Sequence, residues 1–249
     1  ILVTPHRHPA LRWLTQRVLR ACTLTTSDSL HMADRMRELG ATEVMSFPFG
    51  LETLPAPPGR KDEHLVFANR GLEPIYAPER VLQVFRAIAT HWTDAKLVVA
   101  NDGSLRHALE QQVSAQGLGA QVQFVGRLDA VTQANWYRQA RWYLSLPVSD
   151  SVSVSVLEAM AHGCIPLLSD LPANRELVSD GSNGMILGVG QCPGPSELDR
   201  LAQRAAHVAA GNHDWVARQA MFEPAVERFV SRLHALESRG ALRTGGWSA

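Results

Sequence analysis

Residues 149–166 read SDSVSVSVLEAMAHGCIP, and this stretch says most about the fold. Its pattern predicts the end of a strand, a serine-rich turn and the start of a helix. Such a junction combines free backbone N–H groups with the positive end of a helix dipole. Asp150 and Glu158 add carboxylates that can accept hydrogen bonds from hydroxyl groups. The stretch is therefore suited to a phosphorylated sugar.

On both sides of this stretch, short β-branched apolar runs alternate with amphipathic segments of helical length. The runs are almost continuously apolar, which is typical of strands covered on both faces. The segments between them are long enough for crossover helices, so the pattern predicts an α/β fold with a parallel, doubly wound sheet. The expected strands are 64–68, 96–100, 122–125, 142–146, 165–168 and 184–187, and the expected helices lie near 78–91, 104–116, 130–139, 155–162, 172–179 and 196–210.

The composition argues against several classes of protein. With 24 Lys and Arg against 24 Asp and Glu, the chain has no basic excess that would attract nucleic acid. Its three cysteines are too few and too scattered for a disulfide framework or a metal knuckle, so a reducing, cytoplasmic compartment is expected. No apolar run approaches the roughly 20 residues that span a bilayer. No G-x-G-x-x-G follows the first strand of the sheet, which argues against a dehydrogenase.

The chain divides at residues 53–61, where three prolines and a glycine oppose both helix and interior strand. We expect this segment to be a linker between a remnant of an amino-terminal domain at 1–52 and a sheet-forming domain at 62–212. Within the remnant, Ser29 is expected to cap a helix that Gly40 stops.

The carboxyl-terminal part carries a broad apolar stripe over residues 214–237. We expect a helix at 213–240 that packs back on the domain junction, and Pro224 should kink or interrupt it. The tail at 241–249 is expected to fray. The chain starts at Ile1 rather than at a methionine, which favours a fragment of a longer protein.

Polar residues or glycines follow five of the expected strands. Ligands of open parallel sheets bind outside the carboxyl ends of the strands, so these residues are expected to share one edge. They are Asn69-Arg70-Gly71, Asn101-Asp102-Gly103, Gly126-Arg127, Ser149-Asp150-Ser151 and Ser169-Asp170.

The chain resembles the carboxyl-terminal, donor-binding half of retaining glycosyltransferases of family 4, the group 1 glycosyltransferases with two Rossmann-like domains in the GT-B arrangement. The match runs from about residue 18 to residue 235, and its most specific part is Leu157-Glu158-Ala159-Met160-Ala161-x-Gly163-x-Ile165-Pro166. The segments that carry it are 25–27, 47–51, 69–71, 97–103, 122–126 and 150–176.

The resemblance implies transfer of a sugar from a nucleoside diphosphate sugar to a hydroxyl, with retention of configuration. Glu158 is expected to hold the ribose hydroxyls, Asp150 to lie near the donor hexose, and Arg70 to neutralise the diphosphate. No metal or other cofactor is expected. The further donor-binding residues implied are Asn69, Gly71, Asp102, Gly103, Gly126 and Arg127, together with Ser153, Val154 and Ser155, which would offer backbone N–H groups.

The resemblance also implies partners and a setting. The expected acceptor is a glycan or a lipid-linked molecule in cell-surface polysaccharide or glycoconjugate assembly, and the missing amino-terminal domain of the same protein would hold it. A cytoplasmic protein is expected, with peripheral association at the inner face of the membrane.

Three features depart from the family pattern. Asp150 is one methylene shorter than the usual glutamate. The family's lysine downstream of the phosphate arginine is missing, and its place falls on Ile75 or Tyr76. Most of the amino-terminal domain is absent from the sequence. The missing lysine and the aspartate substitution favour an alternative function, a non-catalytic nucleotide-sugar-binding module. A GT-B-like sugar-nucleotide epimerase is a third hypothesis.

The site residues also have plainer interpretations. Ser155-x-x-Glu158 fits a capping box, in which Glu158 only returns to the backbone of its own helix. Asp150 could close an Asx turn, and Arg70 could be a solvated arginine after a strand. His162 is expected to be a helix-end residue, and Cys164 a core residue.

Overall fold

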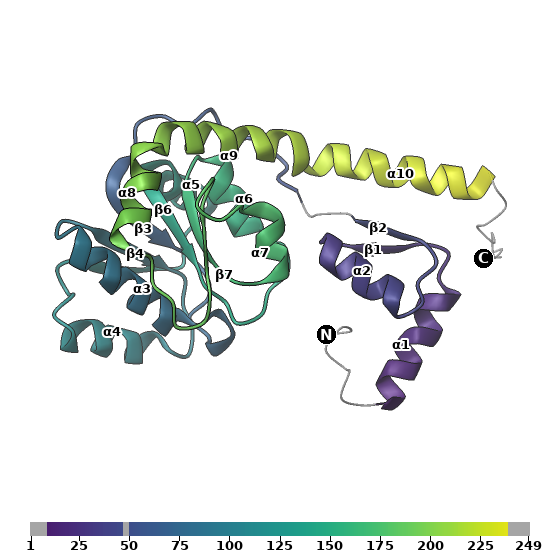
Figure 1. Cartoon of the computed structure of the whole chain (residues 1–249), viewed down its shortest axis with the longest axis horizontal. Coiled ribbons are helices and arrows are strands. Elements are labelled where there is room, and N and C mark those ends of the chain that lie inside the picture. Colours follow the sequence, from purple (N-terminus) through teal and green to yellow (C-terminus); the bar gives the residue numbers. More distant parts are fainter. Residues whose placement is uncertain (1–8, 47–49, 239–249) are drawn as a thin grey trace. The chain divides into compact units, whose positions relative to one another are not determined.

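The computed structural model describes residues 9–46 and 50–238 (Figure 1). The chain forms two compact units. The larger unit spans Thr53–Ala220, and the smaller one combines the segments before and after it. Within the described residues, no helix is both long and apolar enough to cross a membrane.

The larger unit is built on a six-stranded sheet in which every neighbouring pair of strands is parallel. The strand order is β5-β4-β3-β6-β7-β8, so the direction of winding reverses between β3 and β6. This order is that of doubly wound nucleotide-binding folds, whose ligands bind at the reversal. The strands are β3 Asp62–Ala68, β4 Lys96–Ala100, β5 Val122–Gly126, β6 Ala140–Ser145, β7 Ile165–Ser169 and β8 Met185–Leu187.

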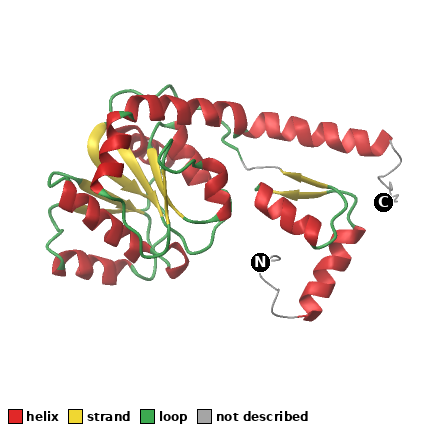
Figure 2. Ribbon diagram, in the orientation of Figure 1, coloured by secondary structure: helices red, strands yellow, loops and turns green. Residues whose placement is uncertain are grey.

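Helices surround this sheet (Figure 2). Val66 and Ala68 of β3 belong to the same buried cluster as Phe85 of α3. Phe67 lies between them in sequence and contacts Tyr137 of α5, with ring centroids 5.1 Å apart. Because side chains alternate along a strand, both faces of β3 are covered, as its apolar sequence predicts. The helices are α3 Pro78–His91, α4 Arg106–Ala115, α5 Ala130–Gln139, α6 Val154–Ala161, α7 Pro172–Leu177, α8 Pro195–Gln203 and α9 Ala205–Gln219, with a 3-10 turn, η2, at Pro74–Tyr76.

The predicted linker ends in a buried anchor. Residues 54–61 form no helix or strand. Lys61, however, is buried, and its Nζ donates to the carbonyl oxygens of Tyr137 at 2.7 Å and Ala140 at 2.9 Å. Burial lowers the pKa of Lys61. The lysine therefore fastens the end of this segment to the carboxyl end of α5, whose last carbonyls lack helical partners.

The helical segments after residue 195 differ from the expectation. The single helix predicted near 196–210 is two helices, α8 and α9, which meet at Arg204. The apolar stripe is also divided, because α9 ends at Gln219 and α10, Phe222–Ser238, begins after a break. Pro224 does not cause a kink within a helix. It lies in the first turn of α10, where its missing N–H costs nothing.

The smaller unit contains a parallel pair of strands with helices around it. Its elements are α1 Pro9–Ala21, β1 Thr25–Ser27, α2 Leu30–Glu38, β2 Val44–Ser46 and α10. The Ser29 side chain accepts a hydrogen bond from the Met32 N–H at the start of α2, and Gly40 follows the helix with a φ of 105°. Both helix signals are confirmed. Arg232 of α10 pairs with Glu43. Residues 47–49 of the family-like segment 47–51, and the tail 241–249, lie outside the described residues.

Candidate functional site at the strand reversal

Arg70 follows β3 and reaches the loop that follows β6. Its Nη2 lies 2.7 Å from Oδ2 of Asp150, and its Nη1 donates to Oγ of Ser153 at 2.6 Å. The side chains of Arg70 and Asp150 are only 18% and 21% exposed. The Arg70 guanidinium also lies over the ring of Tyr76, 4.6 Å from its centroid. Tyr76 thus covers one face of the guanidinium, and Asp150 and Ser153 bind its nitrogens. Arg70 is therefore not a solvated arginine.

The amino terminus of α6 lies beside this guanidinium. Ser153 is the N-cap residue, but its side chain caps no helix N–H and accepts from Arg70 instead. Val154 and Ser155 are the first two residues of the helix, so their N–H groups have no intrahelical acceptor. A guanidinium and the positive end of a helix thus coincide, and both favour an anion. This arrangement can bind a phosphate group.

Asp150 has two roles in the structure. Its Oδ1 accepts a hydrogen bond from the Ser151 N–H at 3.0 Å, as a turn residue would, while its Oδ2 pairs with Arg70. The turn interpretation is therefore incomplete, because the carboxylate also links the β6–α6 loop to the end of β3.

The capping-box interpretation of Glu158 is wrong. The box would need Ser155 at the N-cap position, but the N-cap is Ser153, which places Glu158 in the second turn of α6. The Glu158 carboxylate instead accepts two hydrogen bonds at Oε2, from the Tyr137 hydroxyl at 3.0 Å and from Nε2 of Gln133 at 3.2 Å. Burial raises the pKa of Glu158, and these two hydrogen bonds oppose the rise.

Asn69 does not offer its side chain to a ligand. Its Nδ2 donates to the Tyr137 hydroxyl at 2.8 Å, and its Oδ1 accepts from the Tyr143 hydroxyl at 2.7 Å. The side chain is buried. Asn69 therefore stays a predicted donor-binding residue through its backbone alone, since its side-chain atoms are already hydrogen-bonded within the protein.

Of the other predicted donor-binding residues, Gly126 is the last residue of β5, and the rest lie in the loops after β3, β4 and β5; these are Gly71, Asp102, Gly103 and Arg127. Backbone hydrogen bonds join these loops. The Leu72 N–H donates to the Asp102 carbonyl at 3.0 Å, and the Asn101 N–H donates to the Gly126 carbonyl at 2.6 Å. A Cβ at Gly103 would lie 2.4 Å from the Leu72 oxygen, so this approach requires glycine. Arg127 is exposed.

The structure thus brings Arg70, Asp150 and Ser153 into direct contact, and a hydrogen-bond path through Asn69 and Tyr137 joins Glu158 to the end of β3. The sequence reasoning missed Tyr137 and Gln133, and it named Tyr76 only as a possible replacement for the family's lysine, not as a contact of Arg70. A signal existed for the first two, because Gln133 and Tyr137 are four residues apart on one helix face. Nothing in the sequence identified that face's partner.

His162 and Cys164 occupy the positions expected of them. His162 is the C-cap residue of α6, and its Nδ1 lies 2.8 Å from the Glu158 carbonyl. Cys164 is fully buried. Among the residues that the structure describes, no three His, Cys, Asp or Glu side chains are grouped to hold a metal ion.

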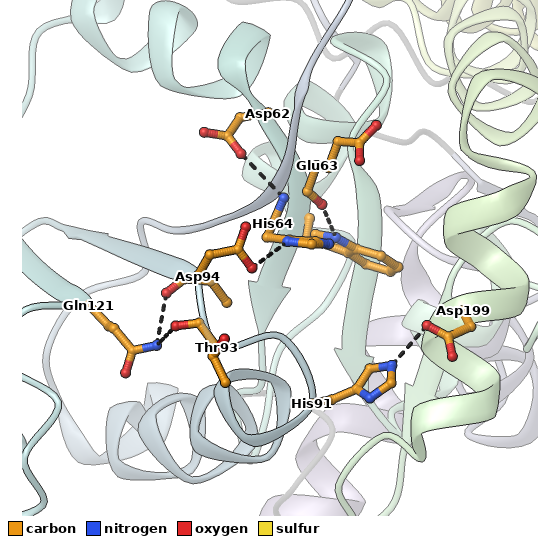
Figure 3. Close-up of polar contacts among 10 residues, drawn as sticks. Asp62, Glu63, His64, His91, Thr93, Asp94, Gln121 and Asp199 are labelled. Carbon is orange, nitrogen blue, oxygen red and sulfur yellow. Dashed lines mark hydrogen bonds and ion pairs between the residues drawn. The ribbon is translucent and has the colours of Figure 1, made fainter.

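A second polar cluster lies at the amino ends of β3 and β4, away from this site (Figure 3). His64 Nδ1 lies 2.7 Å from Asp94 Oδ1, and His91 Nε2 lies 2.8 Å from Asp199 Oδ1. The His64 ring stacks on Trp92 at a centroid distance of 4.5 Å. These contacts fix the turn between α3 and β4, which is a structural role.

The family model described as glycosyl transferases group 1 matches residues 53–192, more than half of the chain. A phosphatidyl-myo-inositol mannosyltransferase of Mycolicibacterium smegmatis is 27% identical over 169 residues, which cover 63% of this chain and 42% of that protein. An alpha-monoglucosyldiacylglycerol synthase of Streptococcus pneumoniae is 24% identical over 156 residues, covering 63% of this chain and 34% of that protein. The chain spans less than half the length of these relatives.

Solved structures have the same fold. The sucrose-phosphate synthase from Thermosynechococcus elongatus superposes with a TM-score of 0.78 at 15% identity, over 96% of this chain and 65% of that one. The Anabaena protein HepE, solved with UDP-glucose, gives 0.74 at 14% identity, over 95% of this chain and 71% of that one. The predicted fold, a GT-B type Rossmann-like α/β sheet, is confirmed. By fold and by family match, this chain belongs to the group 1 glycosyltransferases.

Proposed function

We propose that the chain is the donor-binding half of a retaining, family 4 glycosyltransferase that uses a nucleoside diphosphate sugar. One observation carries the proposal: Arg70 lies at the amino terminus of α6 and contacts Asp150, at the strand reversal of the sheet. The solved relative HepE was crystallised with UDP-glucose, which supports a donor of this class.

The diphosphate would lie against Arg70 and the N–H groups of Val154 and Ser155. A guanidinium has five N–H donors, and the hydrogen bonds to Asp150 and Ser153 leave others for phosphate oxygens. When the bond between the anomeric carbon and the phosphate oxygen breaks, negative charge collects on the leaving diphosphate. Arg70 and the helix terminus are already in position to stabilise that charge.

The two acids would contact different parts of the donor. Both hydrogen bonds to Glu158 fall on Oε2, and within the described part of the chain its Oε1 has no partner. We propose that Oε1 accepts hydrogen bonds from the ribose hydroxyls. Asp150 would face the hexose, where its negative charge stabilises the positive charge that grows on the sugar ring.

The acceptor would be a glycan or a lipid-linked molecule. The names of two relatives support this, one a phosphatidyl-myo-inositol mannosyltransferase and the other an alpha-monoglucosyldiacylglycerol synthase. We propose that a separate amino-terminal domain supplies the acceptor side, and that the complete enzyme works in cell-surface glycoconjugate assembly at the cytoplasmic face of the membrane.

A non-catalytic nucleotide-sugar-binding module is the second candidate. It is favoured by the pairing of Arg70 with Asp150 and by the presence of Tyr76, rather than a second cation, beside the guanidinium. Both candidates bind a nucleoside diphosphate. Transfer of labelled sugar by the complete enzyme separates them.

The first expected result concerns this chain alone. It should bind a nucleoside diphosphate but transfer no sugar, because without a second domain the acceptor is neither positioned nor shielded from water. A thermal-shift screen with UDP, GDP and ADP identifies the donor class. A nucleotide at 100 times its Kd stabilises a fold by about 2.7 kcal/mol. Calorimetry then gives the Kd. The absence of a shift with all three nucleotides would contradict the proposal, and so would sugar transfer by the isolated chain.

The second expected result concerns metals. Transfer by the complete enzyme should persist in excess EDTA, because Arg70 and the α6 terminus would neutralise the diphosphate in place of a cation. Initial rates with EDTA, and with added magnesium or manganese, provide the measurement. A strict requirement for either ion would indicate that Asp150 or Glu158 is a metal ligand rather than a sugar contact.

A further inference from the structure

A buried chain of hydrogen bonds leads from the core of the sheet to Glu158. The Tyr143 hydroxyl donates to Oδ1 of Asn69, Nδ2 of Asn69 donates to the Tyr137 hydroxyl, and the Tyr137 hydroxyl donates to Oε2 of Glu158. The distances are 2.7, 2.8 and 3.0 Å. The members come from the end of β3, from β6, from α5 and from α6.

The chemistry of the groups fixes the direction of every bond. The Tyr137 hydroxyl has a single proton and two acceptors, Oε2 of Glu158 at 3.0 Å and the Ser155 carbonyl oxygen at 3.2 Å. An ionised carboxylate and a carbonyl oxygen can only accept, so Tyr137 is the donor in both contacts, and Glu158 is the nearer acceptor. Its hydroxyl oxygen must then accept from Asn69, which turns the Asn69 carbonyl oxygen towards Tyr143. Burial raises the pKa of Tyr137 well above its usual value, so this hydroxyl keeps its proton. The Asn69 amide therefore has one orientation that satisfies both tyrosines, and the Tyr137 proton is directed towards α6, where its nearer acceptor is Glu158.

We propose that Tyr137 is a positioning residue for nucleotide binding, which holds the Glu158 carboxylate in one orientation so that Oε1 is presented to the ribose hydroxyls. This inference rests on the proposed function of the site. A free glutamate side chain loses rotamer entropy when a ligand fixes it, whereas a side chain already held by Tyr137 and Gln133 loses little. The same contacts offset the cost of keeping a charged carboxylate half-buried.

The test compares two buried tyrosines in the 249-residue chain. Tyr137→Phe removes the hydroxyl that donates to Glu158 and contacts the Ser155 carbonyl, whereas Tyr143→Phe removes a hydroxyl that donates to Asn69 and interacts with the Ser155 side chain. Each change leaves Asn69 with one fewer partner, so both should lower the melting temperature. Calorimetry uses whichever of UDP, GDP and ADP binds the unmodified chain, with the matching nucleoside and inorganic diphosphate as separate probes.

We expect Tyr137→Phe to raise the Kd of the nucleoside diphosphate by about tenfold, as the loss of a hydrogen bond to a charged group would. The Kd of the nucleoside should rise by a similar factor. The Kd of inorganic diphosphate should not rise, because its proposed contacts are at Arg70. Tyr143→Phe should change the Kd of each of the three probes by no more than about twofold. Gln133→Met removes the second hydrogen bond to Glu158 and leaves the contacts of Asn69 in place. It should raise the Kd of the nucleoside but not that of inorganic diphosphate.

A double-mutant cycle separates positioning from general destabilisation. In a Glu158→Ala background, Tyr137→Phe should no longer affect the Kd, because its effect passes through the carboxylate. Equal losses in the two phenylalanine variants, or a Tyr137→Phe effect that persists without Glu158, would overturn the inference and leave the proposed function intact. If the unmodified chain binds none of the three nucleotides, the inference about Tyr137 and the proposed function are both overturned.

Discussion

Replacing Asp150 with asparagine in the complete enzyme should lower kcat by roughly 30- to 1,000-fold, equivalent to about 2–4 kcal/mol of transition-state stabilisation. The carboxylate would face the sugar as positive charge develops there, and asparagine keeps the shape but not the charge. The loss should appear in kcat, because the interaction strengthens as the glycosidic bond stretches.

The same variant should not weaken the binding of a nucleoside diphosphate. Asp150 pairs with Arg70 in the structure, so a bound phosphate would have to share the guanidinium with it. Removing that competing charge leaves the affinity unchanged or increases it. Steady-state kinetics and calorimetry together test this. Unchanged turnover would exclude Asp150 from the chemistry, and a fall in nucleotide affinity as large as the fall in kcat would place it on the nucleotide instead.

Replacing Arg70 with methionine should raise the Kd of the nucleoside diphosphate by roughly 30-fold or more. Methionine keeps an apolar stem against Tyr76 but removes the charge and all the N–H donors. The affinity for the nucleoside alone should remain, because its proposed contacts are at Glu158. The melting temperature should also fall, since the half-buried Asp150 carboxylate loses the guanidinium that balances its charge.

Arg175→Met is the matched control for Arg70→Met. Arg175 forms a comparable pair with Asp170, at 2.6 Å, just after β7, but its side chain is 58% exposed. An exposed ion pair contributes little to the stability of the fold, so its loss should hardly change the melting temperature. The nucleotide Kd should change by less than about threefold. If both variants weakened nucleotide binding equally, the positive charge at Arg70 would have no specific role.

The fold was largely predictable because its signals are local. Six apolar runs indicated the six strands of the sheet, and α3 and α5 have the predicted bounds. Pro78 and Asp129 mark the starts of these two helices, and the Asp129 side chain caps α5 by accepting from the Thr132 N–H. Signals of this kind act within one turn of helix, so a sequence window contains them completely.

The predictions that were wrong concern choices between two equally good local patterns. The serines at 153 and 155 both suit an N-cap, and the glutamate three residues after Ser155 favoured the wrong one. Similarly, Pro224 suggested an interruption within a helix, whereas the break precedes it. There the Phe222 N–H donates to the Leu51 carbonyl, a distant partner that no local pattern reveals.

By itself, the sequence determined the parallel sheet, its rim of polar residues and the pair of acids around the start of α6. Only the tertiary structure decided what those residues contact. Arg70 and Asp150 are 80 residues apart, and Asn69 and Tyr137 are 68 apart, yet each pair forms a short hydrogen bond. Such contacts depend on strand order, which brings β3 beside β6, and on the packing of α5 against both strands. Hydrophobic periodicity and helix capping reflect forces within one segment of the chain. The pKa and the hydrogen bonds of a carboxylate depend instead on the groups that replace water around it, which come from distant segments.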